Sequence, residues 1–262
     1  MPKISVLMGV YNCAGTVGGS IESIQAQTFT DWEMIICDDG SGDNTVEIIR
    51  EYADKDNRLK LIQNDENHGL AYTLNRCIGY SVGEYCARMD GDDICAPDRF
   101  AIQNEFLDAH PEYGFVSTTM KRFDERGVYQ CQDIGEDYSP AKNDLVKGSP
   151  FCHAPAMIRR STYDAVNGYR DVPQTLGDED YDLWFRIYAA GITGYMLNNP
   201  LYSMRDDREA ARRRSFRRRL NEARVRKEGY KAIGAPFYKR IFVLKPILIG
   251  LIPQFIYRKV LR

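Results

Sequence analysis

Three carboxylates stand close together in the segment Asp90-Gly91-Asp92-Asp93, and their types and spacing could do chemistry. Unpaired carboxylates this close repel one another, so a fold that assembles them commonly supplies a cation. Oxygen ligands without cysteine suit hard ions such as Mg²⁺ or Mn²⁺, which often keep one or two protein carboxylates and leave other positions to water and substrate phosphates. An acidic turn or a calcium loop would have a similar sequence. The motif alone therefore leaves all three interpretations open.

A second group of acids lies much later in the chain. Four of five consecutive positions are acidic, at Asp178, Glu179, Asp180 and Asp182. Apolar residues spaced behind them predict an amphipathic helix over 180–191. Acids in the first turn of a helix complement its dipole, a structural role that four of them would fill redundantly.

Buried strands must bring such groups together. The near-continuous apolar run of Lys3–Val10 predicts a strand buried on both faces, and further strands are predicted at Trp32–Cys37, Leu59–Gln63 and Glu84–Arg88. Helical patterns separate them, including one over Leu70–Ile78. This alternation indicates βαβ units and a parallel sheet, whose ligands bind beyond the carboxyl ends of the strands.

Polar residues follow three of these predicted strands. They are Tyr11-Asn12, Asp38-Asp39 and the Asp90–Asp93 motif, and we expect them at one edge of the sheet. Asp38 and Asp39 could accept hydrogen bonds from a ribose hydroxyl or a base N–H, or could cap the turn that follows. No Gly-x-Gly-x-x-Gly or Gly-x-x-x-x-Gly-Lys-Ser/Thr motif is present, which argues against a dinucleotide dehydrogenase and a P-loop enzyme.

Composition sets the broad class. A chain of 262 residues with 44% apolar residues can form one large domain or two small ones with a buried core. Its seven cysteines are scattered, odd in number and free of Cys-x-x-Cys pairs, which argues against zinc and a disulfide framework and fits a reducing cytoplasm. The apolar run after Met1 is too short for a secretory leader. We therefore expect a cytoplasmic protein.

Charge is divided unevenly along the chain. Residues 205–262 hold 18 Lys and Arg against 5 Asp and Glu, a net charge of +13, and residues 1–204 carry −15. A basic helix is predicted over Ala210–Lys227, which could simply expose its arginines to solvent. The apolar stretch Pro246–Tyr257 is too short and too interrupted to span a bilayer. It suits an element lying in a membrane interface, or one that packs on the body or on a second subunit.

Several segments, taken in order, resemble the inverting family 2 glycosyltransferases of GT-A fold. They are Ile4–Asn12, Ser23–Phe29, Ile36–Ser41, Asn64–Asn75, Met89–Asp93, Pro97–Arg99 and Glu179–Arg186. The resemblance covers residues 3–200. It implies an α/β fold with a Rossmann-like, mostly parallel central sheet flanked by helices. This domain would occupy residues 1–204, with a nucleotide-binding half at 1–109, an acceptor half at 110–204, and a C-terminal helical basic and apolar tail at 205–262.

The resemblance also implies residue roles for donor binding. Val10, Tyr11, Asn12 and Asp39 would hold the nucleotide, with Asp39 facing the N3–H of uracil. The Asp-x-Asp pair would consist of Asp90, on ribose or metal, and Asp92, in direct contact with Mn²⁺ or Mg²⁺. Asp93 is a further candidate that would support this pair. Such a metal neutralises the departing diphosphate of a UDP-sugar.

For catalysis, the resemblance makes Asp180 the general base. A carboxylate suffices if the proton moves late, as the acceptor oxygen attacks an oxocarbenium-like carbon. One base opposite the leaving UDP gives a single displacement with inversion. Glu179 is a further candidate, and so is His153, which could touch the metal or diphosphate or be structural.

We thus expect a hexosyltransferase that builds cell-surface polysaccharide. The Gln-x-x-Arg-Trp motif of processive relatives is absent, so one sugar should be added per encounter. The expected acceptor is a glycan or lipid-linked glycan, reached from an anionic membrane surface through residues 205–262 on the inner face of the cell membrane. A homodimer through the tail is an alternative, and no nucleic acid is expected. A nucleotidyltransferase, a glycoside hydrolase and a non-catalytic relative remain open.

Overall fold

The structure is a computed structural model that describes residues 1–206 and 216–251. Its first half alternates strands and helices as the apolar runs predict. The elements are β1 (Ile4–Val10), α1 (Val17–Gln25), β2 (Trp32–Asp38), α2 (Thr45–Ala53), β3 (Leu59–Gln63), α3 (Leu70–Tyr80), β4 (Tyr85–Asp90), β5 (Ile94–Cys95) and α4 (Arg99–Ala109).

The second half is less regular. Its elements are β6 (Tyr113–Asp124), β7 (Gly127–Cys131), β8 (Met157–Arg159), α5 (Arg160–Val166), α6 (Glu179–Ala189), β9 (Thr193–Arg205), α7 (Phe216–Ala232), the 3₁₀ helix η2 (Phe237–Leu244) and α8 (Lys245–Leu251). Strands β6 and β7 pair as an antiparallel hairpin.

The strands form a nine-stranded sheet in the order β3-β2-β1-β4-β8-β6-β9-β5, with β7 paired to β6. Strands β3, β2, β1 and β4 are parallel. Beyond them the sheet is mixed, because the three-residue β8 runs antiparallel to both β4 and β6. Since β9 is parallel to β6, the carboxyl ends of β4 and β9 lie at the same edge of the sheet.

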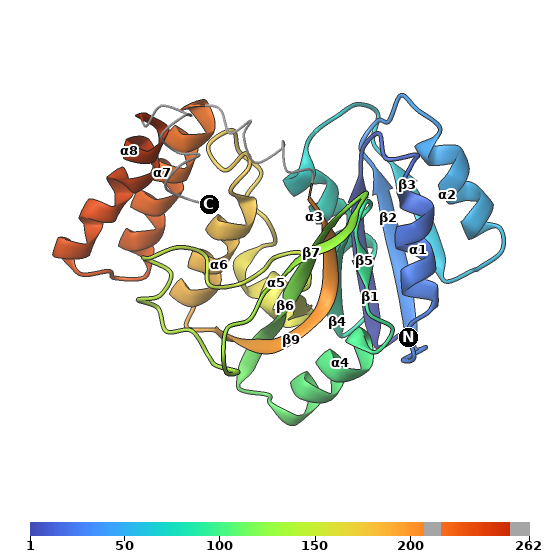
Figure 1. The fold of residues 1–262 in the computed structure, drawn as a ribbon, viewed down its shortest axis with the longest axis horizontal. Coiled ribbons are helices and arrows are strands. Elements are labelled where there is room, and N and C mark those ends of the chain that lie inside the picture. Colours follow the sequence, from blue (N-terminus) through green and yellow to red (C-terminus); the bar gives the residue numbers. More distant parts are fainter. Residues whose placement is uncertain (207–215, 252–262) are drawn as a thin grey trace.

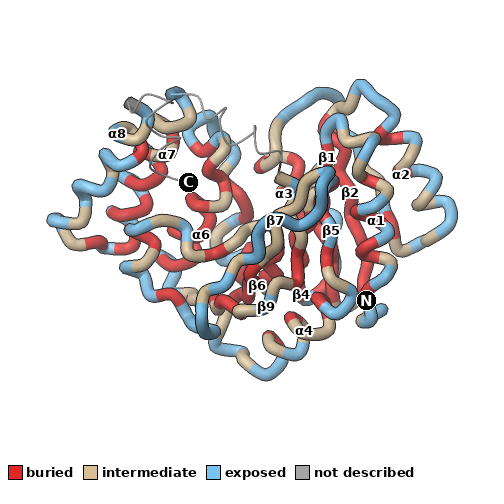
Figure 2. The backbone as a smooth tube through the Cα atoms, viewed as in Figure 1, coloured by how far each residue is buried: buried red, intermediate tan, exposed pale blue. Residues whose placement is uncertain are grey.

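Helices cover both faces of the sheet (Figure 1). Leu7 of β1 packs with residues of α3, α5 and α6 in one apolar cluster. Its neighbours Val6 and Met8 pack with residues of α1, α2 and α4 in a second cluster on the opposite face. This alternation follows from the two-residue period of a strand. Strands β1, β2 and β4 are almost wholly buried between the two helix layers (Figure 2), so their side chains can meet a ligand at the edge of the sheet.

Helix α7 belongs to the folded body. It packs beside α6, and its Val225 and Tyr230 join the apolar cluster that contains α3 and α6. In Figure 1, α6, α7 and α8 lie together at one end of the molecule, away from α1 and α2. Helix α7 contains residues 216–227 of the helix predicted over Ala210–Lys227 and continues to Ala232, whereas residues 210–215 lie outside the described residues. Its buried residues distinguish it from a purely solvated helix.

Candidate active site

The three polar segments predicted to meet do lie at one sheet edge. In the parallel register, Val10 pairs with Asp38 and Gly9 pairs with Asp90. A cavity of about 410 Å³ opens there, lined among others by Tyr11, Asp92 and Arg205. Gly91 and Val10 both line the cavity and lie close together. A Cβ at position 91 would lie 2.8 Å from a methyl carbon of Val10, so a glycine fits there.

A larger cavity, of about 580 Å³, lies at the opposite edge, where the strands begin. Its charged groups already have partners: Lys3 pairs with Glu84 and Asp108, and Arg160 donates to Ser81. This cavity also receives none of the residues predicted to act on a ligand. The smaller cavity is therefore the candidate site.

Asp39 is buried beside the site, where its backbone amide donates to the carbonyl of Val10, a lining residue, at 2.8 Å. Its Oδ1 accepts hydrogen bonds from Asn64 Nδ2 (2.6 Å) and the His68 amide (3.0 Å), and its Oδ2 accepts one from the Gly69 amide (2.8 Å). Gly69 adopts φ +90°, a conformation that favours glycine. A carboxylate has about four lone-pair sites, so one acceptor position remains for a ligand N–H.

Tyr11 and Asn12 follow β1 at the mouth of the cavity. Tyr11 is half exposed and lines the cavity. Asn12 adopts φ +50°, and its side-chain oxygen accepts a hydrogen bond from the Gly42 amide (2.8 Å). Its backbone N–H donates to the Ser41 hydroxyl (2.9 Å), so Asn12 connects the loop after β1 to the loop after β2.

The carboxylates of the acidic motif lie in different surroundings. Asp90 accepts from the buried guanidinium of Arg88 (2.6 Å), whereas Asp92 is exposed at the cavity. Asp93 is buried and accepts from the Arg205 amide (2.6 Å). Partial desolvation by the surrounding protein and the negative charge of Asp90 raise the pKa of Asp92, and burial with both neighbouring carboxylates raises the pKa of Asp93 to about 8. The motif thus brings three carboxyl groups together, and Asp90 among them is paired with Arg88.

These surroundings fit a hard cation better at Asp92 than at Asp90, because an Asp90 oxygen already contacts Arg88. Within the described residues, no group of three or more His, Cys, Asp or Glu side chains is placed to hold a metal. Two carboxylates beside an open cavity instead match an ion that takes its other ligands from water and phosphate.

Asp180 lies in the first turn of α6 and is half-buried. Helix α6 runs back against the sheet before β9, so its first turn lies on the side where β9 ends at Arg205 (Figure 1). The charge of Asp180 raises the pKa of Cys152 and of Tyr169, secondary to burial in both cases. The predicted base and the acidic motif therefore lie on the same side of the molecule.

The other acids of this turn support the backbone or the helix. Glu179 is buried and accepts from the Gly177 amide (2.8 Å). Asp178 is buried too, and burial with the charge of Glu222 raises its pKa to about 7. Asp182 is buried and forms ion pairs with Arg170 (2.6 Å) and Arg186 (2.7 Å). None of these three lines the candidate cavity.

His153 lies in an aromatic network. Its Nε2 is 2.7 Å from the Tyr169 hydroxyl, and its ring packs edge-on against Trp184. Burial and the nearby charge of Arg88 lower its pKa well below the usual value, so the ring is neutral. His153 is outside the lining of the cavity, which favours its structural interpretation.

Arg205 is a residue of the site that sequence reasoning did not single out. As the last residue of β9 it lines the cavity, its Nε donates to the Asp92 carbonyl (3.2 Å), and its guanidinium lies 4.7 Å from the Phe123 ring centre. In the sequence it only opens the basic tail. Its position depends on the pairing of β9 with β6 and β5, for which the chain carries no local signal.

Comparison with known proteins gives a consistent assignment. Residues 5–166 match the model of a family described as Glycosyl transferase family 2. A Bacillus subtilis protein, putative glycosyltransferase EpsE, is 41% identical over 253 residues, covering 96% of this chain and 90% of its own length. An Escherichia coli protein, UDP-Glc:alpha-D-GlcNAc-diphosphoundecaprenol beta-1,3-glucosyltransferase WfgD, is 36% identical over 100 residues, covering 38% of this chain and 39% of its own.

Solved structures share the fold. Staphylococcus aureus TarS 1–349 in complex with UDP-GlcNAc has a TM-score of 0.73 at 18% identity and covers 95% of this chain and 71% of its own. The mannosyltransferase PcManGT of Pyrobaculum calidifontis, in complex with GDP-Man and Mn²⁺, has a TM-score of 0.65 at 19% identity. It covers 95% of this chain and 75% of its own. At these identities the likeness concerns the GT-A fold.

Proposed function

The chain belongs to glycosyltransferase family 2, and we propose that it transfers one sugar per encounter from a UDP-sugar to a hydroxyl acceptor, with inversion and with the help of Mn²⁺ or Mg²⁺. The observation that carries this proposal is the cavity at the ends of β1 and β4, which Asp92 and Arg205 line and beside which Asp39 is buried. A nucleotide, a diphosphate and a cation each have a suitable group there.

The nucleotide would bind between the loops after β1 and β2. Tyr11 offers an exposed ring to the uracil. Asp39, fixed by three N–H donors, offers its remaining acceptor position to the uracil N3–H. A cation held by Asp92, with Asp90 beside it, would neutralise charge on the leaving diphosphate. Arg205 would face the same diphosphate from β9 and supply a fixed positive charge.

Asp180 would remove the proton of the acceptor hydroxyl. A base on the face opposite the leaving UDP permits one displacement and thus inversion of the anomeric carbon. Both tryptophans, Trp32 and Trp184, are buried in the core. Neither ring is therefore available to hold a growing chain, which agrees with addition of one sugar per encounter.

The deciding experiment measures UDP release from a panel of UDP-sugars, in the presence of Mn²⁺ and a short-chain lipid diphosphate-sugar acceptor. We expect acceptor-dependent UDP release from at least one donor. Pyrophosphate release from UTP and a sugar phosphate would instead identify a nucleotidyltransferase. Binding of UDP without turnover of any donor would favour a non-catalytic relative.

The acceptor that we propose is a lipid-linked glycan on the inner face of the cell membrane. The name of the WfgD relative and the basic tail of this chain support this choice. Among the described residues, no helix is both long and apolar enough to cross a bilayer. Helices η2 and α8 nevertheless expose a row of apolar side chains at Phe237, Tyr238, Ile241, Phe242, Leu244 and Leu248. Lys239, Arg240 and Lys245 stand among them. The rest of the predicted interfacial stretch, from residue 252 on, lies outside the described residues.

Truncation after Gly234 is expected to abolish co-sedimentation with vesicles of anionic lipid. Polybasic attraction contributes roughly 1 kcal/mol per nearby charge, and buried apolar surface contributes about 25 cal/mol per Å², so both contributions fall together. The full-length variant Ile241→Asp leaves α7 covered and should weaken sedimentation in the same direction. High salt should weaken binding of the full chain, since the attraction is screened. Equal sedimentation of the full and truncated chains would instead favour a packing or dimer element.

A further inference from the structure

Helix α7 lies close against α6, the helix that bears Asp180. A Cβ added at Gly229 would stand 2.2 Å from the ring of Phe185, so this glycine permits the close approach. Arg226 is buried, with its guanidinium 5.1 Å from the ring centre of Tyr181. It donates to the Val146 carbonyl at 3.3 Å. The two helices thus form one packed unit with polar contacts inside it.

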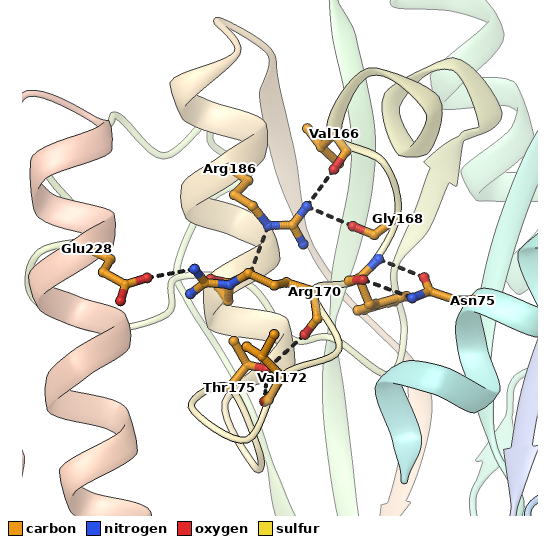
Figure 3. A network of polar contacts seen from close by, with 10 residues as sticks. Asn75, Val166, Gly168, Arg170, Val172, Thr175, Arg186 and Glu228 are labelled. Atoms are coloured by element: carbon orange, nitrogen blue, oxygen red, sulfur yellow. Dashed lines mark hydrogen bonds and ion pairs between the residues drawn. The ribbon is translucent and has the colours of Figure 1, made fainter. Parts of the chain in front are cut away.

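Arg170 joins the loop before α6 to both helices of this unit (Figure 3). One guanidinium nitrogen lies 2.6 Å from an oxygen of Asp182 on α6, and another donates to Glu228 on α7 at 2.6 Å. The preceding residue, Tyr169, exchanges two backbone hydrogen bonds of 2.8 Å with the side chain of Asn75 on α3. The loop before α6 is therefore fixed to α3 in the nucleotide-binding half, to α6 and to α7.

The turn that starts α6 is held from the same side. Arg218 of α7 donates to the Gly177 carbonyl at 2.6 Å, and Asn221 donates to the Pro173 carbonyl at 3.1 Å. Gly177 adopts φ +84°, and a Cβ there would lie 2.7 Å from Arg218 Nε, so a glycine fits this contact. Both the turn and the helix that follows it are thus fixed by α7.

These contacts leave Asp180 on a separate face. Residues two apart on an α-helix are separated by about 200°, so Asp182 and Asp180 point to nearly opposite sides of α6. The ion pairs of Asp182 with Arg170 and with Arg186 (2.7 Å) hold α6 from behind the predicted base. Misplacement of a reacting group by about 1 Å can cost 10²-fold in rate, so such a support has consequences for turnover.

We propose that Arg170, together with its partner Glu228 on α7, is a positioning residue that holds the base-bearing turn of α6 in register with the donor half. This inference rests on the proposed function of Asp180. The basic segment after β9 thereby contributes, through α7, to the reaction as well as to any surface attachment. Glu228 is half exposed, so its ion pair should add little to global stability while still orienting Arg170.

The test compares full-length Arg170→Gln, Arg170→Lys and Glu228→Gln variants. Arg170→Gln should lower kcat by between about tenfold and 10²-fold, with the affinity for UDP measured by calorimetry unchanged. Arg170→Lys should recover part of this loss, because an ammonium keeps the charge but cannot engage both carboxylates as a fork does. Glu228→Gln should lower kcat about threefold, in line with an exposed pair. Arg224→Gln removes an exposed charge from α7 and should leave kcat unchanged.

Amide hydrogen exchange supplies a readout independent of turnover. In Arg170→Gln, the amides of residues 177–182 should exchange faster, while those of β1 and β2 keep their protection. Wild-type kcat and exchange in this variant would overturn the proposal, as would a parallel loss of UDP affinity and of protection throughout the sheet. If the wild-type protein turns over no donor, the proposed function fails, and the exchange measurement still decides whether Arg170 holds the turn.

Discussion

Replacement of Asp180 by asparagine is expected to lower turnover by a factor on the order of 10²–10⁴, the usual contribution of a positioned general base. Asparagine keeps the shape of the side chain in the first turn of α6 but cannot accept the acceptor's proton. Affinity for UDP should stay within about twofold, because Asp180 is outside the lining of the donor cavity. The measurement is steady-state UDP release with a saturating donor, beside UDP titration by calorimetry.

The choice of control for this variant depends on the structure. Asp182, two residues on, is unsuitable because its replacement would leave Arg170 and Arg186 without their buried carboxylate partner and so destabilise the helix. Asp171→Asn is better matched, since it removes one exposed carboxylate from the loop before α6. Its turnover should equal that of the wild-type chain. Near-normal turnover of Asp180→Asn would place the base elsewhere.

Sequence patterns predicted for a physical reason which polar segments gather at one edge of the sheet. Strands buried on both faces appear as continuous apolar runs, and the polar residues that end them must gather at one edge of a parallel sheet. Asp39 and the Asp90–Asp93 motif were located in this way. Their individual surroundings were not, because the Arg88 partner of Asp90 and the Asn64 partner of Asp39 depend on side-chain packing.

The contacts of the loop before α6, of β8 and of α7 were harder to predict because they join distant segments. Arg170 pairs with Asp182 and Glu228, and the second of these lies 58 residues away. Strand β8 is too short for a periodic signal, although it turns the parallel sheet into a mixed one. Helix α7 buries Arg226, Gly229 and Asn221 as well as Ala223, Val225 and Tyr230, so charged, amide and glycine residues make up half of its buried face. A helix with such contacts has the composition of a solvated one, so its packing against α6 had no sequence signal.

The second large effect concerns the cation. Affinity for UDP should increase by about tenfold or more when EDTA is replaced by Mn²⁺, since a bridging ion adds on the order of 1.4 kcal/mol or more of binding free energy. Asp92→Asn should abolish this gain while the fold survives, because Asp92 is exposed at the cavity. Asp90→Asn should reduce the gain and also lower stability, since it would leave the buried guanidinium of Arg88 without its carboxylate partner.

Calorimetry with Mn²⁺, Mg²⁺ and EDTA measures the metal effect directly and needs no knowledge of the sugar or the acceptor. Asp54→Asn, which removes an exposed carboxylate at the end of α2, should keep the full gain. Thermal unfolding of each variant separates a lost metal ligand from a damaged fold. Equal UDP affinity of the wild-type chain with Mn²⁺ and with EDTA would contradict the assignment of Asp92. The fixed charge of Arg205 would then be the leading group for neutralising the diphosphate, because it lines the same cavity.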